Sequence, residues 1–154
     1  MASGNGRCAI VLATMGYETS AYELTNSGIK VIQKNSAIQN VHVNCKKVDF
    51  IAESFVSEKF NVVVSSGLYE EIPLNTHELA TKRFVQSCLP GGTIVLRYCT
   101  EIKGRGVLAK SDVILEHLEA NNCVINYFNE LQDFKISKAN FELKHATILA
   151  KKIY

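Results

Sequence analysis

The cysteines of this sequence have the widest choice of chemistry, because thiolates bind metals, form disulfides and act as nucleophiles. The chain has five of them, at positions Cys8, Cys45, Cys88, Cys99 and Cys123. Their number is odd, and no two stand at the C-x-x-C spacing whose local turn aims two thiolates at one metal. This pattern favours small, partly buried apolar side chains in a reducing compartment over a disulfide framework, a zinc site or an iron–sulfur site.

The histidines and one acidic pair are the other candidates for acid–base chemistry. The four histidines, His42, His77, His117 and His145, are scattered along the chain. No carboxylate or cysteine stands at a motif spacing from them, so the sequence assigns neither a catalytic triad nor a metal cluster. Glu70 and Glu71 form the adjacent acidic pair beside an expected crevice. They could act as acid or base, or simply begin the helical region that follows.

The composition is that of one compact domain. The chain has 154 residues, 47% of them hydrophobic, and a net charge of +2 from dispersed basic and acidic residues. Short basic pairs such as Lys46-Lys47 are typical of solvated faces, so no nucleic-acid footprint is indicated. No apolar run approaches the roughly 20 residues of a membrane span, and residues 1–7 do not resemble a secretory signal.

Residues 60–97 predict a strand, a helix, a turn and a second strand. Residues 62–64 and 93–96 are short β-branched runs that suit strands buried on both faces of a parallel sheet. Apolar residues recur at helical spacing through residues 79–89. Pro90, Gly91 and Gly92 then end the helix, because proline cannot continue the ladder and glycine readily adopts positive φ.

The rest of the chain predicts the same alternation. The expected elements are strands at residues 8–13 and 40–44, helices at residues 18–34 and 107–120, and final strands at residues 123–128 and 140–151. The last two are too close for a crossover helix, so they should pair antiparallel. Residues 48–60 have no clear state. Residues 98–106 form a polar loop whose Gly104-Arg105-Gly106 could bind an anion, although such sequences are more often turns.

The strand end at residues 60–67, with the Leu89-Pro90-Gly91-Gly92 turn and the strand after it, resembles the middle of class I methyltransferases that use S-adenosylmethionine. This resemblance implies a Rossmann-like α/β three-layer sandwich, with a mostly parallel sheet and antiparallel final strands. In that family the first strand leads into a glycine-rich turn near the methionine part of the cofactor. The second strand ends in an acidic residue for the ribose hydroxyls.

Both cofactor features look lost when the strands are placed as above. The turn after residue 13 contains one glycine, with Met15 and Tyr17 crowding the crevice, and the second strand ends without a carboxylate. We therefore expect no useful binding of S-adenosylmethionine, with an affinity of about millimolar or weaker. The degenerate pocket would be lined by Thr14, Gly16, Asn44, Ser65, Ser66 and Gly67. No catalytic residue and no metal ligand is assigned.

The whole order of elements resembles the amino-terminal methyltransferase-like domain of the anamorsin family, including the weak turn at Thr14-Met15-Gly16 and the closing run at residues 148–152. The resemblance implies a flexible start at residues 1–7 and one domain at residues 8–154. It also implies a non-catalytic scaffold for cytosolic iron–sulfur protein assembly and electron transfer, with no cofactor in this domain and clusters only in a carboxyl-terminal region.

Partners and location follow from the same resemblance. It implies docking to protein partners, a diflavin reductase among them, in the cytoplasm, with the mitochondrial intermembrane space as a second location. We also expect a monomer that binds neither nucleic acid nor membranes. Two alternatives stay open: an active S-adenosylmethionine-dependent methyltransferase with an atypical cofactor loop, and a pseudo-methyltransferase domain of a larger enzyme.

The cysteine spacing makes a direct prediction about metals. The purified chain should retain no stoichiometric zinc or iron–sulfur cluster, because its cysteines lack ligand spacing. Elemental analysis measures this. A full equivalent of metal, lost when two of the cysteines are changed to serine, would contradict the prediction.

Overall fold

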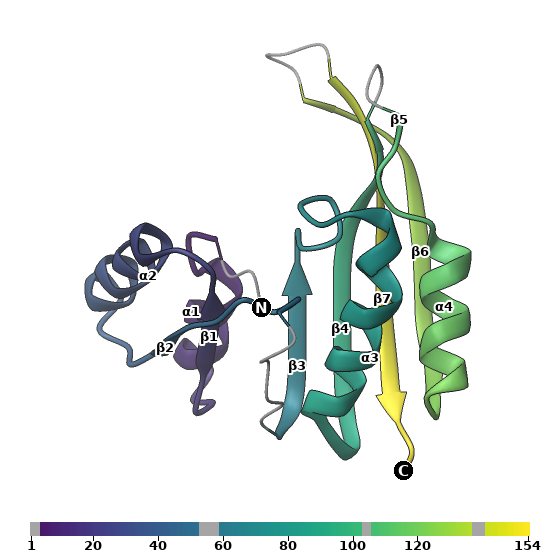
Figure 1. Ribbon diagram of the computed structural model, residues 1–154. Helices are drawn as coiled ribbons and strands as arrows, with labels where there is room; N and C mark the ends of the chain where they lie inside the picture. Colours follow the sequence, from purple (N-terminus) through teal and green to yellow (C-terminus); the bar gives the residue numbers. More distant parts are fainter. Residues whose placement is uncertain (1–3, 53–58, 103–105, 137–140) are drawn as a thin grey trace. The chain divides into compact units, whose positions relative to one another are not determined.

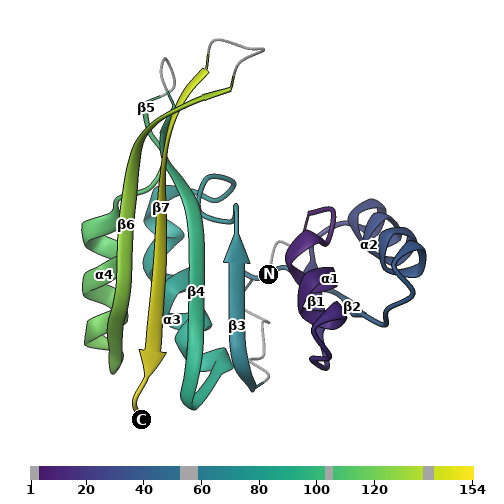
Figure 2. The same ribbon diagram turned by 180° about the vertical axis from the view of Figure 1, so that it is seen from behind.

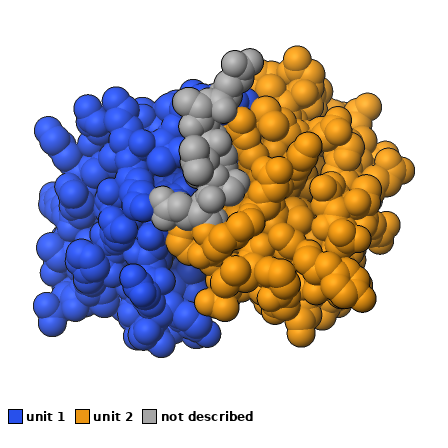
Figure 3. All heavy atoms as spheres, turned by 60° about the horizontal axis from the view of Figure 1, so that its bottom comes forward, with its two compact units in different colours: residues 1–55 blue, residues 56–154 orange. Residues whose placement is uncertain are grey.

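The computed structural model describes residues 4–52, 59–102, 106–136 and 141–154. It divides into two compact units, residues 1–55 and residues 56–154, which are coloured separately in Figure 3. In the described part of the chain, no helix is both long and apolar enough to cross a membrane.

Unit 1 contains two helices and a two-stranded parallel sheet (Figure 1). Its elements are α1 (Arg7–Thr14), β1 (Ser20–Glu23), α2 (Asn26–Ile38) and β2 (Asn44–Lys47). The two strands pair in register from Ser20 opposite Asn44 to Glu23 opposite Lys47. The core is small and is formed by Ala9, Ala21, Ile32 and Val43, which come from both helices and the sheet.

The predicted strand at residues 8–13 is wrong, because this segment is helix α1. Ala9, Ile10 and Ala13 belong to the core cluster, whereas Cys8 and Val11 are exposed. This spacing is that of one helix face rather than the alternation of a strand. A short apolar run cannot by itself distinguish a buried strand from a buried helix turn.

The next two predictions are displaced along the chain for related reasons. Residues 18–34 were expected to form one helix, but they begin with β1, and α2 starts at Asn26. The Thr25 hydroxyl accepts the Gly28 amide at 3.0 Å and so caps this start. The strand expected at residues 40–44 begins at residue 44 instead, since Asn40 adopts a positive φ of 51° and turns the chain after α2.

Unit 2 is a sheet with two helices on one face. Its elements are β3 (Phe60–Ser66), the 3-10 turn η1 (Leu74–Thr76), α3 (His77–Ser87), β4 (Cys88–Ile102), β5 (Gly106–Val107), α4 (Ser111–Ala120), β6 (Cys123–Ile136) and β7 (Phe141–Lys152). The main strand order is β3-β4-β7-β6, and β5 pairs with β4. Figures 1 and 2, seen from opposite sides, place α3 and α4 on the same face of this sheet.

The strand directions confirm the predicted α/β class with antiparallel final strands. β3 runs parallel to β4, while β7 pairs antiparallel with both β4 and β6. Alternate residues of the central strands are buried, including Ile94 and Leu96 of β4 and Ile148 of β7. Ile114 and Leu118, one helical turn apart on α4, are also fully buried.

Helix α3 ends at Ser87, before the predicted Pro90-Gly91-Gly92 turn, and these three residues lie within β4 where its pairing with β3 is irregular. This irregular segment requires glycine. Gly91 has φ of 74°, which other residues rarely adopt. A Cβ on Gly92 would lie 2.7 Å from the Cys88 sulfur and 2.8 Å from the Asn61 carbonyl oxygen. The backbone of β3 therefore approaches Gly92 too closely for a side chain at that position.

The polar loop and the following helix were predicted with wrong boundaries. β4 continues to Ile102, and β5 pairs with it, so residues 98–102 are strand rather than loop. The candidate anion-binding residues Gly104 and Arg105 lie outside the described residues, as do Phe55 and Val56 of the ambiguous segment. The predicted helix at residues 107–120 begins only at Ser111, because the Leu108 and Ala109 amides both donate to the Thr100 carbonyl.

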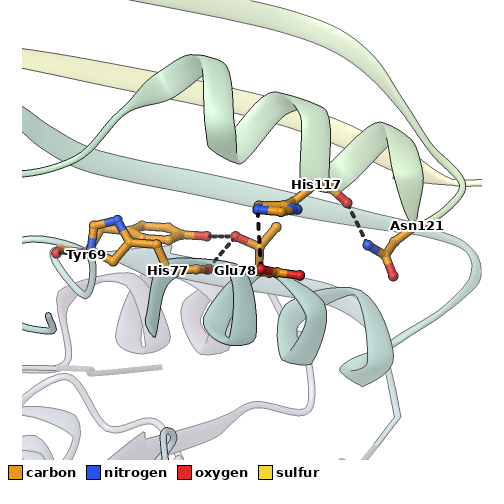
Figure 4. Close-up of polar contacts among 6 residues, drawn as sticks. Tyr69, His77, Glu78, His117 and Asn121 are labelled. Carbon is orange, nitrogen blue, oxygen red and sulfur yellow. Dashed lines mark hydrogen bonds and ion pairs between the residues drawn. The ribbon is translucent and has the colours of Figure 1, made fainter. Parts of the chain in front are cut away.

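A buried polar network fixes the loop after β3 to helix α3 (Figure 4). Tyr69 is 1% exposed, and its hydroxyl donates to the Thr81 hydroxyl oxygen at 2.8 Å while Thr81 donates to the His77 carbonyl at 2.9 Å. His77 Nε2 lies 3.0 Å from the Tyr69 carbonyl oxygen, which closes the ring of contacts. Burial raises the pKa of Tyr69, so this hydroxyl stays protonated.

This network predicts a measurable share of the stability. Tyr69→Phe should lower the free energy of unfolding by about 0.5–1.5 kcal/mol, because one buried hydrogen bond is lost while the ring packing is kept. Urea denaturation measures the change. Tyr154→Phe is the matched control, since Tyr154 is 79% exposed. Equal stabilities for the two variants would contradict the assigned role.

Candidate cofactor site

Two glycines form a tight turn immediately before helix α1. Gly4 and Gly6 have φ values of 50° and 80°. Gly6 is the N-cap residue of α1 and provides no side-chain cap, and its carbonyl accepts the Ile10 amide at 2.8 Å. The first amides of a helix have no partner within the helix and carry its positive end, so a glycine turn leading into them suits a negatively charged ligand group.

The turn packs closely on helix α2. A Cβ on Gly6 would lie 3.0 Å from Cγ2 of Ile32, and the Asn5 carbonyl accepts the Asn35 side-chain amide at 2.9 Å. Both the positive φ and the short distance therefore require glycine at position 6.

Glu23 is the acidic residue that this turn contacts. It ends strand β1, and its Oε2 accepts the amide of Gly4, 19 residues earlier, at 3.3 Å. Its Oε1 accepts the Thr25 amide at 3.2 Å and the Thr25 hydroxyl at 3.1 Å. A glycine turn at a helix start, followed about 20 residues later by an acid at a strand end, is the arrangement that binds a ribose hydroxyl in nucleotide folds.

A third glycine makes room for this carboxylate. A Cβ on Gly28 would lie 2.6 Å from Cγ and 2.7 Å from Oε1 of Glu23. Gly28 lies inside α2, where glycine costs about 1 kcal/mol relative to alanine. Its presence there is explained by the space that the Glu23 side chain occupies.

A second carboxylate, Asp49, lies at the same edge of the unit 1 sheet. The Val48 amide donates to the Glu23 carbonyl at 3.0 Å, which carries the parallel pairing one residue beyond β2. Asp49 follows directly, is exposed, and accepts the Ile51 amide at 3.0 Å. Glu23 and Asp49 therefore both stand at the carboxyl ends of neighbouring parallel strands, where ligands of α/β folds bind.

These residues were missed because the first strand was misplaced. A strand at residues 8–13 places the expected glycine turn after Ala13 and the expected acid near Asn44. The available signal was the pair Gly4 and Gly6 followed at the right interval by Glu23. This signal is weak because residues 1–7 are small and polar, a composition typical of a flexible tail.

The structure separates the six predicted pocket residues into three groups. Thr14 ends helix α1, which Gly6 caps at its start, and Gly16 lies just beyond Thr14. Met15 and Tyr17 lie at this same end of the helix, away from the turn at Gly4 and Gly6, and are 66% and 52% exposed. Asn44 pairs with Ser20 at the start of the unit 1 strands, which is the opposite end of the sheet from Glu23. Ser65, Ser66 and Gly67 lie together at the carboxyl end of β3 in unit 2. That these six residues line a degenerate cofactor pocket stays a prediction.

Glu70 is the acid–base candidate of unit 2. It lies between β3 and α3, so it does not begin the helix, and its Oε2 is buried without a hydrogen-bond partner among the described residues. Burial raises the pKa of Glu70, hydrogen bonds from its own amide and from the Cys99 amide lower it, and Glu71 and Arg97 exert smaller opposing effects. This carboxyl group therefore keeps its proton to higher pH than an exposed glutamate.

The remaining candidates are dispersed. All five cysteines are free; Cys88, Cys99 and Cys123 are buried, whereas Cys8 is exposed. Burial, followed by the nearby Arg97 charge, lowers the pKa of His145. No group of three potential metal ligands occurs among the residues that the structure describes.

Comparison with solved structures defines the class of fold. TehB from Haemophilus influenzae superposes with a TM-score of 0.79 at 17% identity, covering 97% of this chain and 55% of that chain. A putative methyltransferase from Bacillus halodurans gives 0.79 at 14% identity, covering 99% and 90%. Magnesium protoporphyrin IX methyltransferase from Synechocystis, solved with bound SAH, gives 0.78 at 13% identity, covering 97% and 70%. The predicted Rossmann-like, methyltransferase-type α/β fold is thereby confirmed.

The family follows from the sequence itself. Residues 1–96 match the family described as TehB, tellurite resistance protein TehB. The chain belongs to the TehB family. It spans 55% of the length of the Haemophilus influenzae TehB chain, and no curated protein sequence matches it.

This membership corrects the functional predictions. The anamorsin resemblance is wrong, since the matching family is TehB, and with it the iron–sulfur assembly and electron-transfer roles. The expectations of a non-catalytic scaffold and of a domain without a cofactor are also wrong, because the structural neighbours include a putative methyltransferase, an S-adenosylmethionine-dependent methyltransferase and a methyltransferase solved with bound SAH. The domain boundaries, the monomeric state and the partners stay predictions, although the diflavin reductase has lost its support.

The raised pKa of Glu70 makes a prediction about stability and pH. The fold favours the protonated carboxyl, so the wild type should lose stability as pH rises from the ordinary glutamate value through the raised folded value. Glu70→Gln removes this loss and should gain stability relative to the wild type between about pH 4 and about pH 7. Urea denaturation at both pH values measures it.

Glu119→Gln is the control, because Glu119 is an exposed acid of unit 2 that is not among the charges acting on Glu70. The same pH dependence in both variants, or a relative loss of stability for Glu70→Gln with rising pH, would show that folding does not raise the pKa of Glu70.

Proposed function

We propose that this chain is the cofactor-binding part of an S-adenosylmethionine-dependent methyltransferase and that unit 1 binds the cofactor. The contact between the glycine turn and Glu23 supports this most directly, because it joins the two features that the fold class uses for such a ligand. Membership in the TehB family and the likeness to methyltransferase structures support the same reading.

The residues present fit the cofactor at its charged end. Positive φ at Gly4 and Gly6 allows the backbone to approach a ligand without side chains intervening. The first amides of α1 point out of the helix end and would hold the carboxylate of the methionine part. A side chain at position 6 would be strained by the positive φ and would press on Ile32.

The two carboxylates fit the nucleoside end. Glu23 accepts three hydrogen bonds, and a carboxylate has about four acceptor sites, so it can still accept from a ribose hydroxyl. Asp49, at the same edge and exposed, is an acceptor for the amino group of adenine. Both groups orient the ligand and do not react.

When bound, S-adenosylmethionine supplies an electrophilic methyl group, which is chemistry that no side chain of the chain provides. The chain contributes binding and orientation through Gly4, Gly6 and Glu23. Glu70 stays the acid–base candidate of unit 2, since its pKa is raised by burial.

We also infer that the protein works in the reducing cytoplasm. All five cysteines are unpaired, and the exposed Cys8 would be prone to oxidation outside such a compartment.

The proposal predicts saturable binding of S-adenosylmethionine and its loss when Glu23 is neutralised. Glu23→Gln should weaken binding about 10- to 100-fold, because a charge-assisted hydrogen bond is worth about 1.5–3 kcal/mol. Isothermal titration calorimetry of the whole chain measures this. Glu18→Gln removes the same charge from an exposed residue of unit 1 and should leave the affinity unchanged.

Two outcomes would refute the proposal. Absence of saturable binding by the wild type at millimolar cofactor would remove the cofactor role altogether. Equal losses in Glu23→Gln and Glu18→Gln would show that the carboxylate at the end of β1 does not contact the ligand.

A further inference from the structure

Unit 2 contains a hollow of about 420 Å³ beside the amino end of helix α4. Its walls come from the carboxyl end of β4, from β5, from α4 and from β6, which can be followed in Figure 1. This volume lies in the range of small-ligand sites, and the carboxyl ends of strands are where ligands of α/β folds bind. The lining residues lie beyond the segment matched by the family.

One side of the hollow is apolar. Leu115, Val107 and Phe128 line it, and the last two are 54% and 41% exposed. These side chains are therefore open to a ligand rather than packed into the core of the unit. An aromatic ring or short alkyl chain would remove their surface from water.

The polar side is organised around the carboxylate of Glu130. Its Oε1 accepts the Thr100 hydroxyl at 3.2 Å, and its Oε2 accepts the Ser111 hydroxyl at 3.0 Å. The Ser111 oxygen in turn accepts the Tyr98 hydroxyl at 3.2 Å. Glu130 is thus held in one orientation by neutral donors, and about two of its acceptor sites remain.

The charges around the hollow are mainly negative. Glu130, Asp112 and Glu101 line it against one cation, Lys110. Glu101 is neutralised by Lys144 at 2.6 Å, whereas neither Glu130 nor Asp112 has an ion pair within the described residues. Burial raises the pKa of Tyr98 to about 12; its hydrogen bond with Ser111 opposes this rise, and Glu130 and Asp112 add to it. A negative potential therefore reaches into this wall of the hollow.

We propose that this hollow binds a small organic ammonium ion that carries an apolar group, with the ammonium on Glu130 and the apolar group against Phe128 and Val107. An ammonium has three donors and no acceptor, which complements a carboxylate already fixed by hydroxyl donors. The site lies wholly in unit 2 and goes beyond the proposed cofactor function. It binds its ligand whether or not unit 1 binds S-adenosylmethionine.

A purely structural role for Glu130 gives different results. A carboxylate near the start of α4 complements the positive end of that helix. In that case Glu130→Gln would lower stability and no amine would bind. Measurements of binding and of stability on the same variants therefore separate the two roles.

The test uses benzylamine as the probe and benzyl alcohol as its neutral analogue, titrated into the full chain by calorimetry without S-adenosylmethionine. Benzylamine should bind saturably and benzyl alcohol at least about 10-fold more weakly, because the charged hydrogen bond is absent. Glu130→Gln should weaken benzylamine binding by about 10-fold or more. Glu116→Gln is the matched control on the exposed face of α4 and should bind as the wild type does.

Asp112→Asn serves as the second variant if Glu130→Gln does not fold, and it should also weaken binding, since it removes a lining charge. The proposal is overturned if benzylamine does not bind saturably, if benzyl alcohol binds equally well, or if the folded lining variants match Glu116→Gln. A chain that binds S-adenosylmethionine but not benzylamine would refute this inference alone.

Discussion

The carboxylate of Glu23 holds together the parts of unit 1 on which the candidate site depends. It accepts the Gly4 amide from the turn before α1 and the Thr25 amide and hydroxyl at the start of α2. Glycine is required at position 28 inside α2, because a Cβ there would collide with the Glu23 side chain. One charged group thus fixes the glycine turn, the end of β1 and the start of α2, and it faces the edge of the sheet at which a ligand would be held.

Unit 2 combines an apolar core with polar groups that lie close to that core. The helix-facing residues of β4 and β7 are fully buried, and the Tyr69 network satisfies the polar groups of the loop after β3. Two carboxyl groups of unit 2 have different surroundings, Glu70 in the loop after β3 and Glu130 within β6. Burial raises the pKa of Glu70, whereas Glu130 is held by hydroxyl donors and stays exposed. Unit 2 therefore carries one group suited to proton transfer and one suited to binding a cation.

The sequence predicted the regular parts of the fold and missed the site. The strand at Phe60–Ser66, the end of helix α3 before Pro90 and the antiparallel final strands follow from strong local patterns and are present in the structure. Strands β1 and β2 have four residues each, and β2 reads Asn-Cys-Lys-Lys, which carries no strand signal. Without these two strands, the apolar run at Arg7–Thr14 predicts the first strand, and the glycine turn is then expected after this run rather than before it. The anamorsin resemblance rested in part on the turn at Thr14-Met15-Gly16, which the structure places at the end of helix α1 rather than after a first strand.

The most direct test of this account is the position of the S-adenosylmethionine footprint on the backbone. A titration of the isotopically labelled chain, followed by amide chemical shifts in solution, reports it residue by residue. The account predicts that the largest shifts fall on Gly4, Gly6 and Glu23, with a further set at Asp49. Largest shifts at Gly16 and Asn44, at the opposite end of the unit 1 strands, would contradict it, and so would no shifts at any cofactor concentration.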